Sequence, residues 1–352
     1  MTDQPASAAA APAPSQHQPA IDLHAHMMPR GLWSAADEGR AWRGATYERD
    51  AEGRGWLVVG GVRSGPDPAR LRSTPEDRIR DMDAAGTDVQ VVSMTPLLID
   101  DSLDTDVAVR AAREVNDEIA DWTRAFPTRL RGLATLPLTD VSPAIAELDR
   151  AVAVLGLAGA EVDTRVGDRA WDDPAFEPLF AAAEQLGAIL FFHPSYSLVW
   201  GRITRYHLGN TIGNPAEDLL AAAALIFGGV LDRHPDLKVV IAHGGGPLPF
   251  GIGRMDRGWQ VRRIARTGLL HPPSRDLRGL YVDCITWSEP ALRFLVDTMG
   301  ADRVVLGSDW PYDMGLEEPA RWIRGMTSLT DDEKRLILGV NAARLLASGG
   351  SR

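Results

Sequence analysis

Short apolar runs alternate with amphipathic, helix-like segments along most of this 352-residue chain. Eight runs have the length and composition of buried strands, at 20–23, 89–94, 130–135, 159–162, 189–193, 238–242, 280–283 and 303–307. Helix-like segments follow them at 75–85, 105–125, 141–155, 174–186, 215–228, 289–299 and 319–327. This order predicts an α/β fold, a closed parallel (β/α)8 TIM barrel. A doubly wound open sheet is the alternative, but no glycine-rich phosphate loop follows the first strand.

Two segments do not fit the alternation. Residues 1–19 are rich in alanine and proline and lack a basic start or a continuous apolar stretch, which predicts a disordered tail rather than a signal peptide. The barrel should then span residues 20–348. Between about 31 and 65 the chain is rich in glycine and arginine, and 45–48 could pair with 56–59 as a hairpin. We interpret this stretch as a small insertion after the first strand, over the mouth of the barrel.

The composition excludes several classes of function. A formal net charge of −11 argues against nucleic acid or an anionic membrane as a partner. Cys284 is the single cysteine, so the chain can form neither an internal disulfide nor a cysteine-based zinc cage. No apolar run reaches the roughly 18 residues of a membrane helix. These features fit an enzyme of the reducing cytoplasm.

A His-x-His pair, His24 and His26, lies at the end of the first expected strand. Alternation along a strand places both imidazoles on one face, about 7 Å apart along the backbone, and Asp22 shares that face. Two neutral imidazoles suit zinc or another borderline divalent metal. The pair is therefore a candidate metal site, although short histidine pairs also occur on surfaces and in cores.

Three further polar residues follow the apolar runs of later strands: His193 in FFHP, His243 in AHGGG and Asp309 in LGSDWP. In a β/α barrel the carboxyl ends of all strands meet at one face, so these side chains should converge with the histidine pair. Alone, each histidine could cap a strand and Asp309 could be a turn residue. Together they supply the three or four ligands, with room for water, that a catalytic zinc needs. A purely structural zinc would more often be closed by cysteines.

The motifs IDLHAH, FFHPS, AHGGG and LGSDWPYDMG resemble those of the amidohydrolase superfamily, in its branch of metal-dependent decarboxylases. The resemblance runs from about residue 20 to 346. Within that branch, MDAAGTDVQV, HGGGPLPFGIGRMDRGW and DRVVLGSDWPYDMG are most similar to the carboxymuconate-semialdehyde decarboxylases. One departure concerns the positions after the His-Pro pair, where those enzymes have an aromatic and then an acidic residue and this chain has Ser195 and Tyr196. The departure leaves the substrate open.

The resemblance implies one divalent metal ion per chain, Zn²⁺ or alternatively Mn²⁺. Its ligands would be His24, His26, His193 and Asp309, with Asp309 also taking part in catalysis. His243 would be the acid/base histidine beside a metal-bound water. From its strand end, Asp283 could orient one of the ligands.

The resemblance also implies residues that bind substrate. Arg254 matches an arginine that reaches into the neighbouring subunit's site, which implies a homodimer. Arg63 is the best match to an arginine after the first strand that binds a substrate carboxylate, with Arg54 and Arg70 as alternatives. Trp310, next to Asp309, is expected to form a wall of the pocket.

We therefore predict a carbon–carbon lyase of aromatic catabolism that takes a small anionic carboxylate, an unsaturated or aromatic acid, and removes CO2 without oxidation. Proton transfer by His243 to an electron-rich carbon would precede the loss of CO2. The alternative is a metal-dependent hydrolase of a carbonyl compound, lactone or ring-cleavage product, because the same ligands serve both reactions.

Overall fold

Eight parallel strands follow one another in chain order around a ring. The computed structural model describes residues 18–65, 68–195, 203 and 205–347. On one side of the ring β1 pairs with β5, and β5 with β6; on the other, β7 to β11 pair in sequence. These strands are β1 (Ile21–Met27), β5 (Val89–Met94), β6 (Leu130–Gly132), β7 (Gly159–Val162), β8 (Ile189–Phe192), β9 (Lys238–Ile241), β10 (Leu280–Asp283) and β11 (Val304–Val305).

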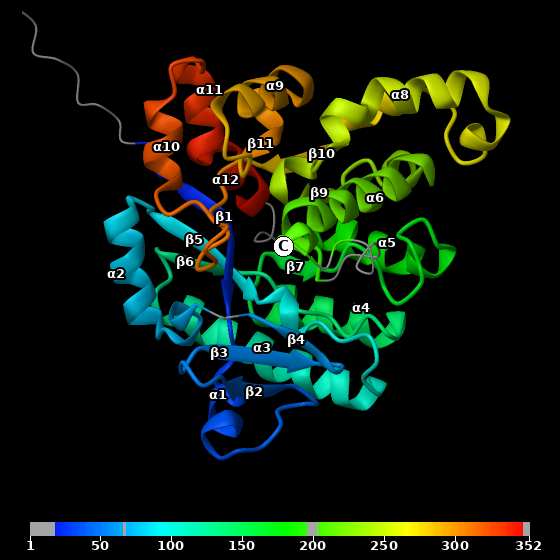
Figure 1. Cartoon of the computed structure of the whole chain (residues 1–352). Helices are drawn as coiled ribbons and strands as arrows, with labels where there is room; N and C mark the ends of the chain where they lie inside the picture. Colours follow the sequence, from blue (N-terminus) through cyan, green and yellow to red (C-terminus); the bar gives the residue numbers. More distant parts are fainter. Residues whose placement is uncertain (1–17, 66–67, 196–202, 204, 348–352) are drawn as a thin grey trace, which may run out of the picture.

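Backbone hydrogen bonds join the two runs of strands and close the barrel. Beyond β6, the Ala134 N–H donates to the carbonyl oxygen of Gly159 over 2.8 Å. At the other junction, the N–H of Leu23 in β1 donates to the carbonyl oxygen of Leu306, just after β11, over 2.9 Å. The strands surround a central axis in Figure 1. The predicted (β/α)8 barrel is confirmed, and the open sheet is not formed.

Helices connect the strands around the outside of the ring. The longer ones are α1 (Arg30–Asp37), α2 (Pro75–Ala85), α3 (Thr105–Ala125), α4 (Val141–Asp149), α5 (Glu177–Leu186), α6 (Asn214–Phe227), α8 (Leu248–Val261) and α9 (Glu289–Met299). The described residues also form shorter helices: α7 (Val230–Arg233), α10 (Pro319–Gly325), α11 (Asp331–Arg335) and α12 (Asn341–Leu346). The sequence pattern predicted no helix between 242 and 280, where α8 lies, because Gly251, Gly253 and Gly258 interrupt its apolar periodicity.

The inside of the barrel is filled by apolar side chains from strands on opposite sides of the ring. Leu23 of β1, Val91 of β5, Phe191 of β8 and Val240 of β9 belong to one buried cluster. Residues of α12 join this cluster. The Phe191 ring lies 4.9 Å from the imidazole of His24, centroid to centroid, so the apolar interior is in direct contact with the first histidine of the metal motif.

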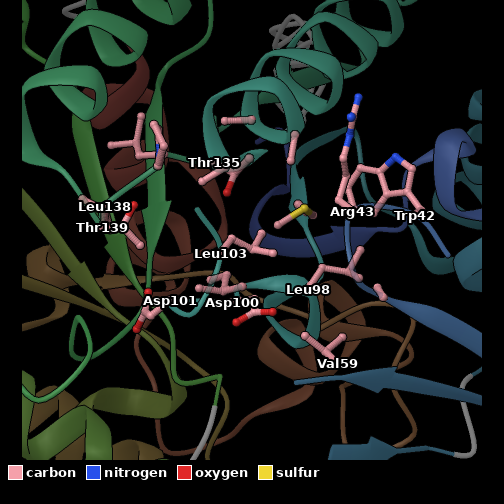
Figure 2. Close-up of a pocket in the computed structure, with 18 residues that line it drawn as sticks. Trp42, Arg43, Val59, Leu98, Asp100, Asp101, Leu103, Thr135, Leu138 and Thr139 are labelled. Carbon is pink, nitrogen blue, oxygen red and sulfur yellow. The ribbon is translucent and has the colours of Figure 1, made fainter. Parts of the chain in front are cut away.

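A three-stranded antiparallel sheet follows β1 and α1. Its strands are β2 (Thr46–Arg49), β3 (Gly55–Val59) and β4 (Val62–Ser64), and Glu48 pairs with Trp56 in the hairpin. Figure 2 shows a pocket in which Val59 and Trp42 face Leu98 and Thr135, which follow β5 and β6. The small sheet thus packs beside the carboxyl ends of these two strands.

Two predictions about the ends of the chain stay untested. Residues 1–17, which make up most of the expected tail, and residue 348, the expected end of the barrel, lie outside the described residues. Among the described residues, no helix combines the length and the apolar character needed to span a bilayer.

Asp22 stabilises the closure of the barrel, which yields a first prediction. Its buried carboxylate accepts hydrogen bonds from the N–H and Oγ of Ser308, at 3.0 and 2.6 Å, and from Gln90 Nε2 at 2.8 Å. Asp22→Ala leaves these donors buried without an acceptor, and we expect a loss of about 3 kcal/mol of unfolding free energy in urea titrations. Asp302→Asn, which removes an exposed ion pair with Arg278, should change it by less than about 1 kcal/mol. Equal losses in the two variants would contradict this role of Asp22.

Candidate metal centre

Four buried side chains converge at the carboxyl end of the barrel: His24, His26, His193 and Asp309. One possible ligand atom from each lies within 4.8 Å of all the others. The two Nε2 atoms of His24 and His26 are 3.1 Å apart, and Asp309 Oδ1 lies 3.3 and 3.2 Å from them. β1 runs on to Met27, beyond the predicted end of the strand, and its register with β5 shifts between Asp22 and Ala25, around His24.

The donor set fits a divalent cation. His193 Nε2 and Asp309 Oδ1 are buried and, within the described part of the chain, make no hydrogen bond. A buried polar atom without a partner is costly, and a cation at the centre of the cluster would satisfy both atoms. Three imidazoles and one carboxylate are a ligand set that zinc and related divalent metals accept.

The ionisation of these groups also favours a cation. Burial lowers the pKa of His26 to about 4 and that of His193 well below its usual value, so both rings are neutral and can act as ligands. Burial alone would raise the pKa of Asp309, but contacts with His24 and His26 hold it well below the usual range. Burial alone would also lower the pKa of His24, but Asp283 and Asp309 raise it well above its usual value. The site therefore combines the neutral imidazoles of His26 and His193 with a carboxylate anion.

Asp283 at the end of β10 fixes both His24 and the segment that carries His243. Its Oδ2 accepts from His24 Nδ1 at 2.8 Å and from the His243 N–H at 2.9 Å, while Oδ1 accepts from the Gly244 N–H at 2.9 Å. Burial would raise the pKa of Asp283, but these donors keep it below its usual value. The proton on Nδ1 leaves Nε2 of His24 to face the other ligands, so the expected orienting role of Asp283 agrees with its position.

The other two histidines are oriented in the same way through Nδ1. His193 Nδ1 donates to the carbonyl oxygen of Pro194 over 3.0 Å, which again directs the Nε2 lone pair toward the cluster. His26 Nδ1 lies 3.3 Å from Ser93 Oγ and 3.6 Å from Glu161 Oε2. Burial raises the pKa of Glu161 to about 8, so this carboxyl is largely protonated at neutral pH.

His243 lies beside the four candidate ligands and is paired with a carboxylate. Its ring centroid is 4.9 Å from that of His193 and 5.4 Å from that of His24. Nδ1 donates to Asp218 Oδ2, on α6, over 2.9 Å. Burial alone would lower the pKa of His243, but Asp218 raises it above its usual value. The ring can therefore carry a proton on Nε2 next to the four candidate ligands, as a general acid requires.

Two residues of the centre have strained backbones. His243 and Asp309 have φ angles of 50° and 58°, in the left-handed region that residues with side chains rarely adopt. The hydrogen bonds of the His243 N–H to Asp283 and of the Asp309 N–H to the carbonyl oxygen of His24, at 2.8 Å, hold these conformations. Strain of this kind is concentrated at functional sites.

The three arginines considered as substrate ligands after the first strand lie in different surroundings. The Arg63 guanidinium, on β4, stacks 3.7 Å above the Trp56 ring and is partly exposed. Arg54 pairs with Asp50 in the exposed hairpin, at 2.7 Å. Arg70, in contrast, lines a pocket together with Trp310.

Trp310 contacts the centre through its backbone, because its carbonyl oxygen accepts from the His26 N–H over 2.7 Å. The expected roles of its ring as a pocket wall and of Arg254 in a neighbouring site stay predictions. Arg254 is exposed on α8, the helix that extends away from the barrel in Figure 1. The Trp310 ring packs 4.0 Å below the guanidinium of buried Arg78. Of the two positions marked as departures, Ser195 donates a backbone hydrogen bond to Asp163 over 3.1 Å, and Tyr196 lies outside the described residues.

The sequence patterns did not identify several charged residues around the centre, among them Asp218 and Arg78. Asp218 lies inside an amphipathic helix, where an acidic residue normally faces solvent, and only its burial against His243 marks it as functional. Arg78, in α2, donates to Gln90 Oε1 over 2.6 Å and to the carbonyl oxygen of His26. These hydrogen bonds connect α2 to the backbone of β1. Neither residue stands at a strand end, the signal that identified the others.

The family model described as Amidohydrolase matches residues 21–347. A 2-amino-3-carboxymuconate-6-semialdehyde decarboxylase of Dictyostelium discoideum is 33% identical over 93% of this chain and 91% of its own length. Among solved structures, the 5-carboxyvanillate decarboxylase of Sphingomonas paucimobilis is 26% identical, with a TM-score of 0.79 over 94% of this chain and 99% of that one.

A dihydroxybenzoic acid decarboxylase of Polaromonas sp. JS666, solved with bound manganese, has the same fold, with a TM-score of 0.75 over 95% of this chain and 98% of that one, at 24% identity. These relatives favour the predicted decarboxylase over the hydrolase alternative. The family match extends over nearly the whole described chain, and the chain therefore belongs to the amidohydrolase family, in which its motifs had placed it.

Proposed function

We propose that this protein is a metal-dependent, non-oxidative decarboxylase of an unsaturated or aromatic carboxylic acid. The observation that carries the proposal is the convergence of His24, His26, His193 and Asp309 beside His243. Supporting it, the relatives that match along most of the chain bear the names of decarboxylases, for an aminocarboxymuconate semialdehyde and for 5-carboxyvanillate. A carboxymuconate-semialdehyde-like or hydroxybenzoate-like acid is the proposed substrate.

The chemistry assigned to the chain's own residues is proton transfer. A divalent metal held by the four ligands would act as a Lewis acid on an oxygen atom beside them. His243, paired with Asp218, holds a proton on Nε2 and delivers it to the ring or chain carbon that bears the carboxylate. The bond to the carboxylate carbon then breaks, CO2 leaves, and its electron pair restores the conjugated system. His243 regains its proton from solvent.

The metal is proposed to be Zn²⁺, with Mn²⁺ as the alternative. Three imidazoles favour zinc, and a carboxylate ligand is compatible with either ion. The proposed location of the protein is the cytoplasm.

The proposed substrate is a small anion bound by Arg63 or Arg70, by Trp310 and by Arg254. An arginine fork holds a carboxylate through two parallel hydrogen bonds, which suits such a substrate.

We also infer a homodimer in which α8 forms part of the contact. Three large apolar side chains on or near this helix are strongly exposed: Phe250 at 85%, Ile264 at 82% and Leu270 at 90%. Such a group of exposed apolar side chains marks a protein–protein contact more often than a free surface. Phe250 and Arg254 stand four residues apart on one face of α8, so the same contact would carry Arg254 to the partner.

The proposed reaction predicts CO2 release by purified, metal-loaded protein. The assay offers a panel of carboxymuconate semialdehydes and hydroxybenzoates and measures CO2 together with metal content. We expect about one metal at the centre and CO2 from at least one acid. Hydrolysis of esters, lactones or ring-cleavage products without CO2 release would contradict the proposal and favour the hydrolase.

Two variants separate proton transfer from metal binding in the same assay. His243→Ala should keep its metal and lose turnover by about 10²- to 10⁴-fold, the usual contribution of a general acid. His193→Ala should lose the metal, because it removes a ligand atom that has no other partner. A metal-free His243→Ala together with a metal-replete His193→Ala would reverse the two roles.

A mixing experiment tests the shared site. If Arg254 serves the partner's site, His243→Ala and Arg254→Ala homodimers are each inactive, but a mixed dimer has one complete site. Co-refolding equal amounts should therefore restore about a quarter of the wild-type rate, because half of the dimers are mixed and each has one working site of two. No recovery, in a sample shown to contain mixed dimers, would place Arg254 outside the partner's site.

A further inference from the structure

A second group of possible metal ligands lies at the other end of the barrel. Asp232, His271 and Asp276 each offer a ligand atom, and these atoms lie within 4.8 Å of one another. Asp232 belongs to α7, which precedes β9, and Asp276 belongs to the 3₁₀ helix Pro273–Gly279, which leads into β10. The cluster thus stands at the amino ends of the strands, whereas the candidate metal centre stands at their carboxyl ends.

His271 is held in the orientation of a metal ligand. Its Nδ1 lies 3.3 Å from the carbonyl oxygen of Pro272, the same arrangement that orients His193 through Pro194, at 3.0 Å. Burial alone would lower the pKa of His271, but Asp232 and the Pro272 carbonyl raise it, so Nε2 carries the proton of the ion pair with Asp232. A bound cation would replace that proton and take the lone pair of Nε2. That Nε2 faces both carboxylates: it is 2.9 Å from the oxygens of Asp232 and 3.6 Å from Asp276 Oδ1.

Asp276 supplies a buried carboxylate, one oxygen of which lacks a hydrogen-bond donor among the described residues. Its side chain is only 8% exposed, and Oδ2 has no hydrogen-bond partner among the described residues. Burial raises the pKa of Asp276 to about 6. A carboxylate buried in this way is costly unless a cation or a proton neutralises it. Asp232 is exposed, so an ion can enter the cluster from solvent.

His234 provides a contrast within the same chain. It is also followed by proline and also lies between two carboxylates, but both its ring nitrogens are used: Nε2 lies 2.9 Å from Glu177 and Nδ1 lies 3.1 Å from Glu184. The two carboxylates of this group lie at different ring nitrogens, so the possible ligand atoms do not gather at one point. His271 differs because both carboxylates gather at one nitrogen.

We propose that Asp232, His271 and Asp276 bind a divalent transition-metal cation, independently of the candidate metal centre. Two carboxylates balance the charge of the ion, and the imidazole favours zinc-like metals over Mg²⁺ and Ca²⁺. Three protein ligands leave a coordination position for water. The bound ion links α7 to the segment that leads into β10, the strand that ends at Asp283.

The experiment measures Zn²⁺ binding by calorimetry and by metal analysis on protein that already holds its metal at the candidate centre. We expect wild type to take up a second equivalent. Asp276→Asn and His271→Gln should weaken its dissociation constant by at least about tenfold, or abolish it. Asp232→Asn, at an exposed position, provides a third variant whose folding is not at risk. Mg²⁺ in excess should not displace the zinc.

Two controls make the result decisive. His234→Gln should keep the second equivalent, and His193→Ala should keep it while losing the first, so that failure of the proposed decarboxylase would not be mistaken for failure of this site. A single equivalent in wild type would overturn the proposal. So would a second equivalent that persists at unchanged affinity in Asp276→Asn, His271→Gln and Asp232→Asn.

Discussion

The hydrogen bonding of β1 to the segment after β11 is the interaction on which the site depends. The carbonyl oxygen of His24 accepts from the N–H groups of Ser308 and Asp309, at 3.3 and 2.8 Å, and Asp22 holds Ser308 from the other side. This closure unites the two ends of the barrel and brings Asp309 against the histidines of the first strand. Without it the chain would have a histidine pair and a distant aspartate, but no common centre.

Burying several imidazoles and carboxylates together costs free energy. Hydrogen bonds made by the ring nitrogens that face away from the centre offset part of that cost. His24 is held by Asp283, His193 by the carbonyl of Pro194 and His243 by Asp218. These bonds fix the tautomers and make the inward-facing atoms of the ligands converge. Two inward atoms, on His193 and Asp309, remain without a hydrogen bond in the described part of the chain, and they are the atoms that a cation satisfies.

The barrel and the convergence of the four candidate ligands could be predicted from the sequence because both follow from strand ends. Strand periodicity is local, and a parallel barrel brings all carboxyl ends to one face whatever lies between them. Asp218 and Arg78 could not be identified because they lie in helices, where only tertiary packing distinguishes a buried charge from a solvated one.

The sequence pattern did not predict α8 because the glycines of this helix weaken its apolar periodicity. The roles of Arg63 and Arg254 stay predictions. The His271 cluster was not recognised because its members contact one another only after α7 and the Pro273–Gly279 segment have folded together.

A crystal structure of the metal-loaded protein, with anomalous data at the absorption edge of the bound metal, tests the candidate metal centre most directly. We expect an anomalous peak between His24, His26, His193 and Asp309, with each ligand atom about 2.0–2.2 Å from the ion. Nε2 of His243 should lie near the ion but should not coordinate it. A peak coordinated by His243 or Glu161 in place of one of the four, or no peak at this end of the barrel, would contradict this expectation.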